Sequence, residues 1–136
     1  MLIKSVRGST PSYGLDCFFA ENSTLIGDVK IGDEVSVWYQ AVVRGDVNSI
    51  RIGNKVNIQD GVVIHATFET ASTHIGNNVS IGHNAIVHGC KINDNVLKNL
   101  PKLKIISKYE KKADSQSRSL QKFPSRSKLR NRNGVS

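Results

Sequence analysis

The feature that most constrains the fold of this chain is a set of aliphatic residues that recur about every six positions. Most steps between them are six residues, two are five, and two are longer, nine after Val43 and eleven after Ile64. A sandwich of short strands, the alternative fold, would instead alternate with period two. A hexad period indicates a parallel β-helix. The recurring positions are Ile26, Ile31, Val37, Val43, Ile52, Ile58, Ile64, Ile75, Ile81, Val87 and Ile92.

The two long steps indicate how many hexads make one coil. Val43, Ile64 and Val87 are spaced by 21 and 23 residues, which are 18 plus 3 and 18 plus 5. If three hexads form one coil, both insertions fall at the same corner of successive coils. Gly followed by Asn or Asp suits the corners, because these residues accept backbone angles that others resist. We predict an all-β fold, a single-stranded parallel β-helix of about four triangular coils.

The charge of the chain divides it into two parts. Residues 1–97 carry 7 Lys and Arg against 9 Asp and Glu, a net of −2, whereas residues 98–136 carry 12 against 2, a net of +10. The hexad stops after Leu97, and the basic, Ser-rich remainder has the composition of a disordered segment. We predict a β-helix domain over residues 1–97 and a disordered tail over residues 98–136. Because the tail has few aromatic residues to stack bases, we expect no nucleic-acid partner.

The sequence also limits where the protein is found. No apolar run is long enough to span a bilayer, and the amino terminus lacks the hydrophobic core of a signal peptide. We therefore expect a cytoplasmic protein without a membrane partner. Cys17 and Cys90 have neither metal-binding nor disulfide spacing, and we expect them to be small buried or corner residues.

Three residues follow a recurring aliphatic by one position on the same predicted face: Arg44, His65 and His88. We expect them to stack in one column, with neighbouring coils about 4.8 Å apart. Two imidazoles at that spacing can share a metal ion, since each Zn–N bond is about 2.0–2.1 Å. His83 follows its recurring aliphatic by two positions instead of one. It therefore lies on the preceding face, in a column with Asp60. A neighbouring chain would have to bring it to the same ion.

Three imidazoles on a tetrahedral ion leave one position for water, as catalytic zinc requires. The alternative is that outward histidines on a solenoid are only exposed polar residues. His74 lies at the end of the second insertion, and we expect it to be a solvated loop residue.

The segments VVRGDVNSIRIG, NIQDGVVIH and NNVSIGHNAIVHGC resemble the gamma-class carbonic anhydrase family of left-handed hexapeptide-repeat proteins. The resemblance covers roughly residues 10–97. It implies a left-handed β-helix and a homotrimer with a divalent metal, zinc before iron or cobalt, between its subunits. The implied ligands are His65 and His88 of one chain and His83 of the next. The implied activity is reversible hydration of carbon dioxide to bicarbonate by a metal hydroxide.

The resemblance also assigns supporting residues. It implies that Arg44 and Asp46 pair across the subunit boundary. It places Gln59 and Asp60 in the catalytic shell, with Gln59 beside the metal-bound water. A bidentate pair between arginine and a carboxylate is well suited to fixing an interface.

The resemblance ends at DNVL, where family members usually continue with further coils and a carboxy-terminal helix. Here KNLP follows, and we expect residues 98–136 to derive from a frameshifted or truncated reading frame, with a functional basic arm as the rival. Two alternatives to the lyase remain open. One is an acyltransferase or acyl-CoA thioesterase with a histidine as general base, since one fold hosts several chemistries. The other is a catalytically inactive, truncated family member.

Overall fold

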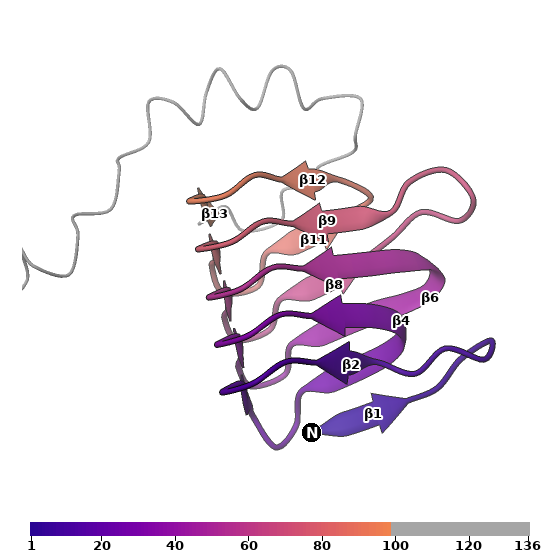
Figure 1. Cartoon of the computed structure of the whole chain (residues 1–136), viewed down its shortest axis with the longest axis horizontal. Coiled ribbons are helices and arrows are strands. Elements are labelled where there is room, and N and C mark those ends of the chain that lie inside the picture. The colour runs from indigo at the N-terminus through magenta and orange to yellow at the C-terminus, as the bar shows by residue number, and fades with distance from the viewer. Residues whose placement is uncertain (99–136) are drawn as a thin grey trace, which may run out of the picture.

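The computed structural model describes residues 1–98, which form a parallel β-solenoid of four full coils and part of a fifth (Figure 1). Every strand pair within it is parallel. The fold class predicted from the hexad is therefore confirmed. Of the predicted tail, residues 99–136 lie outside the described residues. Residues 1–98 contain no helix, and so none that is long and apolar enough to cross a membrane.

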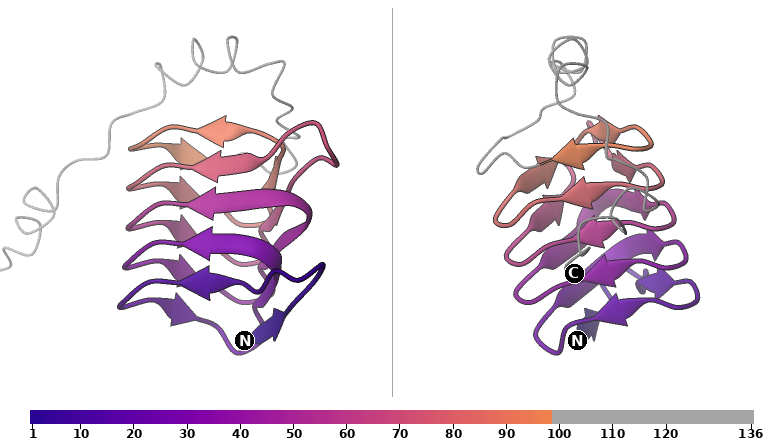
Figure 2. Two further views of the ribbon diagram at one scale, coloured as in Figure 1. Left: turned by 45° about the vertical axis from the view of Figure 1, so that its right-hand side comes forward. Right: turned by 90° about the vertical axis from the view of Figure 1, so that its left-hand side faces the viewer.

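Each coil contributes a strand segment to each of three faces (Figure 2). The histidine face comprises β1 (Leu2–Lys4), the first halves of β4 (Thr24–Ile31) and β6 (Val42–Ile52), β8 (Val63–His65) and β11 (Ile86–His88). The basic face comprises β2 (Ser12–Tyr13), the second halves of β4 and β6, β9 (Thr73–Ile75) and β12 (Lys91–Ile92). The polar face comprises β3 (Phe18–Phe19), β5 (Ser36–Val37), β7 (Asn57–Ile58), β10 (Ser80–Ile81) and β13 (Leu97–Lys98).

The register confirms that three hexads make one coil. Val43 stands opposite Ile64, and Ile64 stands opposite Val87, across two successive coil steps. Both insertions lie at the corner between the histidine face and the basic face. The first is a bend within β6, and the second is the loop that projects between β8 and β9 (Figure 1).

The prediction that Ile26 faces inward is wrong. Leu25 is fully buried and stands opposite Val43, whereas Ile26 is only half-buried and stands opposite Arg44 on the outer surface. Two adjacent aliphatics both fit a loose six-residue spacing, and only one of them can face inward because side chains alternate along a strand. Leu25 also restores a step of six residues to Ile31.

A ladder of side-chain hydrogen bonds holds the corner between the basic face and the polar face. At each coil the Oδ1 atom of an Asp or Asn accepts a backbone N–H from the preceding coil at 2.8 Å. Each of these side chains occupies the space that a Cβ atom would fill at the glycine below it. At Gly53, for example, a Cβ would lie 2.6 Å from Oδ1 of Asn77. The acceptors are Asp33, Asn54, Asn77 and Asp94.

The cysteines behave as the sequence predicts. Neither is in a disulfide, and Cys90 is buried while Cys17 is partly buried against the core.

The register predicts that substitutions at two neighbouring residues change the free energy of unfolding by very different amounts. Leu25→Ala should lower the free energy of unfolding by about 2–5 kcal/mol, because it leaves a cavity in the core. Ile26→Ala removes a half-buried side chain and should cost about 1 kcal/mol or less. Urea unfolding of the two variants measures both values, and equal or reversed losses would contradict the register of β4.

Candidate metal centre

Two histidines stand side by side at the end of the histidine face. His65 on β8 pairs in register with His88 on β11 and with Arg44 on β6, which confirms the predicted column. The centroids of the two imidazole rings lie 5.1 Å apart. Both rings face outward because the preceding residues, Ile64 and Val87, fill the core.

The first insertion supplies a carboxylate to this column. Oδ2 of Asp46 accepts a hydrogen bond from Nη1 of Arg44 at 2.7 Å, and Oδ1 lies 2.9 Å from Nε2 of His65. Gly45 allows this turn, since a Cβ there would lie 2.5 Å from the carbonyl oxygen of Asp28 on the coil below. The Arg-Gly-Asp triplet therefore has a local structural reason as well as a chemical one. Pairing of Arg44 and Asp46 across a subunit boundary stays a prediction, because they pair here within one chain.

The same contacts set the charge of Asp46. Burial raises the pKa of its carboxyl group, but hydrogen bonds with His65 and Arg44 and the charge of Arg44 outweigh burial, and the pKa lies below its ordinary value. Asp46 is therefore ionised at neutral pH and can hold the imidazole of His65 in a fixed orientation. Metal ligands are commonly oriented by carboxylates in this way.

The second insertion supports the other histidine, which no pattern in the sequence predicts. Oγ1 of Thr67 lies 3.3 Å from Nδ1 of His88, and Nδ2 of Asn48 donates to the carbonyl oxygen of Thr67 at 3.2 Å. The hydroxyl of Thr73 donates to the carbonyl oxygen of His65 at 2.6 Å and accepts the N–H of Gly89 at 2.9 Å. Thr67 lies in the insertion and Thr73 is the first residue of β9, and no spacing in the sequence links either of them to a histidine.

The remaining candidates lie at the opposite margin of the histidine face. Nδ1 of His83 lies 3.1 Å from Oδ2 of Asp60 at the corner with the polar face, which agrees with their predicted column. The His83 side chain is 64% exposed. Gln59 precedes Asp60, and its amide donates to Oγ of Ser80 at 3.3 Å.

An apolar column separates the two groups of candidates. Val42, Val63 and Ile86 stack in register on the outer surface of the histidine face, between the corner and the histidine column. We call Arg44, Asp46, His65 and His88 the paired-histidine half-site, and Gln59, Asp60 and His83 the single-histidine half-site. Within residues 1–98, no three His, Cys, Asp or Glu side chains of one chain are placed to hold a metal ion together.

The donors present suit a transition metal. Neutral imidazoles are ligands that zinc, iron and cobalt all accept. The two imidazole rings are neighbours on one face, and a carboxylate contacts His65. Imidazoles held in a fixed orientation in this way are suited to binding such an ion. Nε2 of His65 is hydrogen-bonded to Asp46, so an ion that binds at this nitrogen would replace that hydrogen bond.

His74 does not lie in a loop, contrary to expectation. It is the middle residue of β9, exposed on the basic face and opposite Arg51 and Lys91. The insertion ends at Ser72, two residues earlier than the spacing suggested, and His74 belongs to neither half-site.

Comparisons with known proteins identify relatives of the chain, although no family model matches it. The chain is 56% identical over 78 residues to a Methanocaldococcus jannaschii protein named "Probable carbonic anhydrase", covering 57% of this chain and 48% of the relative. It is 41% identical over 97 residues to "Gamma carbonic anhydrase 2, mitochondrial" of Arabidopsis thaliana, covering 68% of this chain and 35% of the relative.

A solved structure gives the same fold. A hexapeptide transferase family protein from Anaplasma phagocytophilum superposes with a TM-score of 0.66 at 41% identity, covering 71% of this chain and 55% of that one. The chain spans half the length or less of the two curated relatives. The fold is that of hexapeptide-repeat proteins, and the sequence similarities place the chain in the gamma-class carbonic anhydrase family of such proteins.

Proposed function

We propose that this chain assembles into a homotrimer that holds a divalent metal ion between neighbouring subunits and hydrates carbon dioxide reversibly to bicarbonate. One observation carries the proposal: the two half-sites occupy opposite margins of the same face, with an apolar column between them. We also propose a cytoplasmic location.

The apolar column supports the assembly. Val63 is 37% exposed and Ile86 is 38% exposed, on coils that pair directly with each other. Contiguous exposed apolar surface usually marks a protein contact. In a closed three-fold ring each contact is heterologous, so that one margin of a chain meets the opposite margin of the next. The single-histidine half-site of one subunit would then approach the paired-histidine half-site of its neighbour.

The metal would be held by His65 and His88 of one chain and His83 of the next, with zinc as the first candidate and iron or cobalt as alternatives. Such an ion lowers the pKa of a coordinated water to about 7 for zinc and so supplies a nucleophile at neutral pH. Asp46 holds the His65 ring through Nε2 until an ion replaces that contact, and Asp60 orients His83 through Nδ1, which directs Nε2 of His83 outward. Gln59 stands next to Asp60, where its amide can position the water or the substrate.

A second function has one supporting observation, the similarity to a solved hexapeptide transferase family protein. An acyltransferase or acyl-CoA thioesterase on this scaffold would use a histidine as general base and would need no metal.

Metal removal separates these two functions. We expect the purified chain to accelerate carbon dioxide hydration in a stopped-flow assay with a pH indicator. Dialysis against a chelator should reduce the rate to that of buffer, and zinc, cobalt or iron(II) should restore it. Turnover of an acyl thioester that survives chelation would favour the acyltransferase. A chain that binds metal without hydrating carbon dioxide would favour the inactive family member.

Mixed trimers test whether the site is shared. His83→Ala and His88→Ala should each bind little metal alone. When the two variants are unfolded and refolded together, every mixed ring contains one junction with all three histidines. Random mixing should therefore restore about a quarter of the wild-type metal content. Elemental analysis of the refolded mixture measures this value. No recovery in the mixture, or full metal content in His83→Ala alone, would contradict a shared site.

A further inference from the structure

The polar face carries a series of side-chain hydrogen bonds that ends at Gln59 of the single-histidine half-site. The hydroxyl of Ser36 and the indole N–H of Trp38 both donate to Oδ1 of Asn57, at 2.9 and 2.8 Å. The Asn57 amide donates to Oγ of Ser80 at 3.4 Å, and the Gln59 amide donates to the same oxygen at 3.3 Å. We call these five residues, which lie on three successive coils, the polar-face network.

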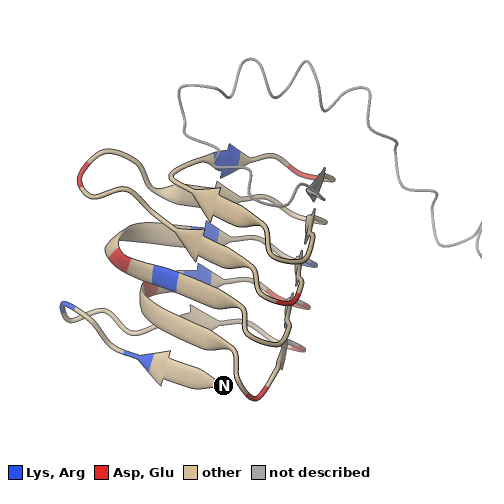
Figure 3. Cartoon of the chain, turned by 180° about the vertical axis from the view of Figure 1, so that it is seen from behind, with Lys and Arg blue, Asp and Glu red and all other residues tan. Residues whose placement is uncertain are grey.

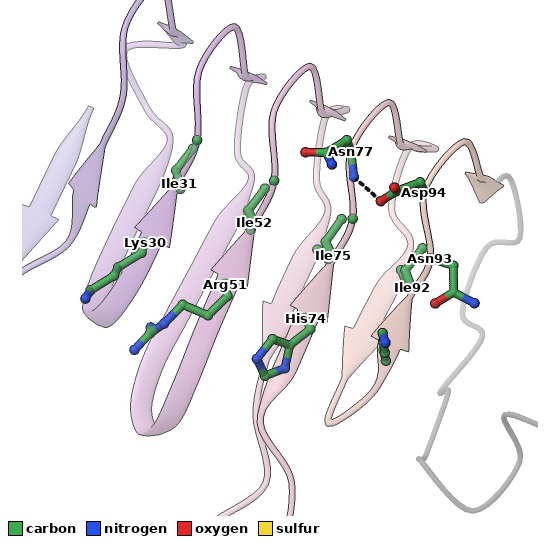
Figure 4. Close-up of a pocket in the computed structure, with 14 residues that line it drawn as sticks. Lys30, Ile31, Arg51, Ile52, His74, Ile75, Asn77, Ile92, Asn93 and Asp94 are labelled. Carbon is green, nitrogen blue, oxygen red and sulfur yellow. Dashed lines mark hydrogen bonds between the residues drawn. The ribbon is translucent and has the colours of Figure 1, made fainter.

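The polar-face network differs from the other hydrogen bonds between coils. The ladder at the adjacent corner joins side chains to backbone, as Asp94 and Asn77 do in Figure 4, and so fixes the backbone. The network joins side chains to one another and so fixes their orientation. Its bonds are between neutral groups, because β3, β5, β7 and β10 contain no Lys, Arg, Asp or Glu, in contrast to strands of the other two faces (Figure 3).

Trp38 fixes the donors and acceptors of the network from one end. An indole N–H can only donate a hydrogen bond, so the Asn57 atom that Trp38 contacts is the carbonyl oxygen. The amide nitrogen of Asn57 then faces the next coil, where Ser80 accepts its hydrogen bond. The ring of Trp38 is itself held against Phe18, with the ring centroids 5.0 Å apart. The orientation of Asn57 is therefore anchored.

The contact with Ser80 determines which end of the Gln59 amide stays available. In the backbone pairing, Gln59 stands opposite Gly82 of the next coil, which offers no side chain. The amide nitrogen of Gln59 instead donates to Ser80 in the neighbouring column. The oxygen of this amide accepts no hydrogen bond from the described part of the chain. An acceptor is therefore available for a ligand, beside the pair formed by Asp60 and His83.

We propose that Ser80 is a positioning residue of the shared metal site, which holds the Gln59 amide with its nitrogen on the polar face and its oxygen available to the ligand. This inference rests on the proposed function. A carbonyl oxygen can only accept a hydrogen bond, so Gln59 favours a ligand with an O–H group, such as bicarbonate, over an anion without one, such as nitrate. Ser80 contacts neither metal nor substrate and acts through Gln59.

Anion binding to the cobalt-loaded full chain, followed by its visible absorption, tests the role of Ser80. Ser80→Ala should weaken bicarbonate binding about fivefold, the loss expected for one hydrogen bond, and should change nitrate binding less than about twofold. Ser80→Thr keeps the hydroxyl and should bind both anions like wild type. Ser36→Ala is the matched control, because Trp38 still fixes Asn57 in it, and it should also bind like wild type.

A double variant shows whether Ser80 acts through Gln59. In a Gln59→Ala background, Ser80→Ala should not weaken bicarbonate binding further. Ser80→Cys, which fills similar space with a weaker hydrogen-bonding group, should repeat the pattern if Ser80→Ala fails to fold.

Three results would overturn the positioning role alone: unchanged bicarbonate binding in the folded Ser80 variants, equal losses for bicarbonate and nitrate, or an undiminished loss in the Gln59→Ala background. A wild-type chain that binds no metal ion gives a different result. It would contradict the proposed function itself, and the role of Ser80 would fail with it.

Discussion

The in-register stacking of parallel coils is the constraint on which the rest of this structure depends. Because each residue pairs with its equivalent one coil away, a residue type repeated in the sequence becomes a column in space. The interior aliphatics, the Asp and Asn ladder, the histidine pair and the polar-face network are all products of that rule. The two insertions lengthen their coils, but both lie at one corner. The pairing shifts there and resumes on the next face.

The same rule explains why the candidate metal site is divided. His65 and His88 share a position in the hexad and therefore meet, whereas His83 falls one position later, in the turn after β10, and lies at the far margin of the face. No rotamer change within one coil stack brings a corner residue to the opposite end of a strand. The proposed ring of chains, packed through the apolar column, would join the two margins and would bury surface that is exposed in the single chain.

The sequence predicts the fold and the columns well, because both follow from spacing alone. The prediction fails where two residues fit the spacing equally well, or where the spacing carries no information about a residue. Leu25 and Ile26 both lie close to a six-residue step, and only burial decides between them. His74 was assigned to a loop because the length of an insertion does not reveal where the next strand begins. Thr67 and Thr73 lie in or just after an insertion, so no pattern pointed to them.

The central claim is that the metal site exists only between subunits. Native mass spectrometry of the purified, zinc-loaded chain tests it most directly, because one spectrum gives the number of chains and the number of metal ions. We expect a species of three chains with three metal ions, and metal-free monomers when Val63→Asp in the apolar column dissociates the assembly in solution. A monomer that retains one tightly bound ion would contradict it.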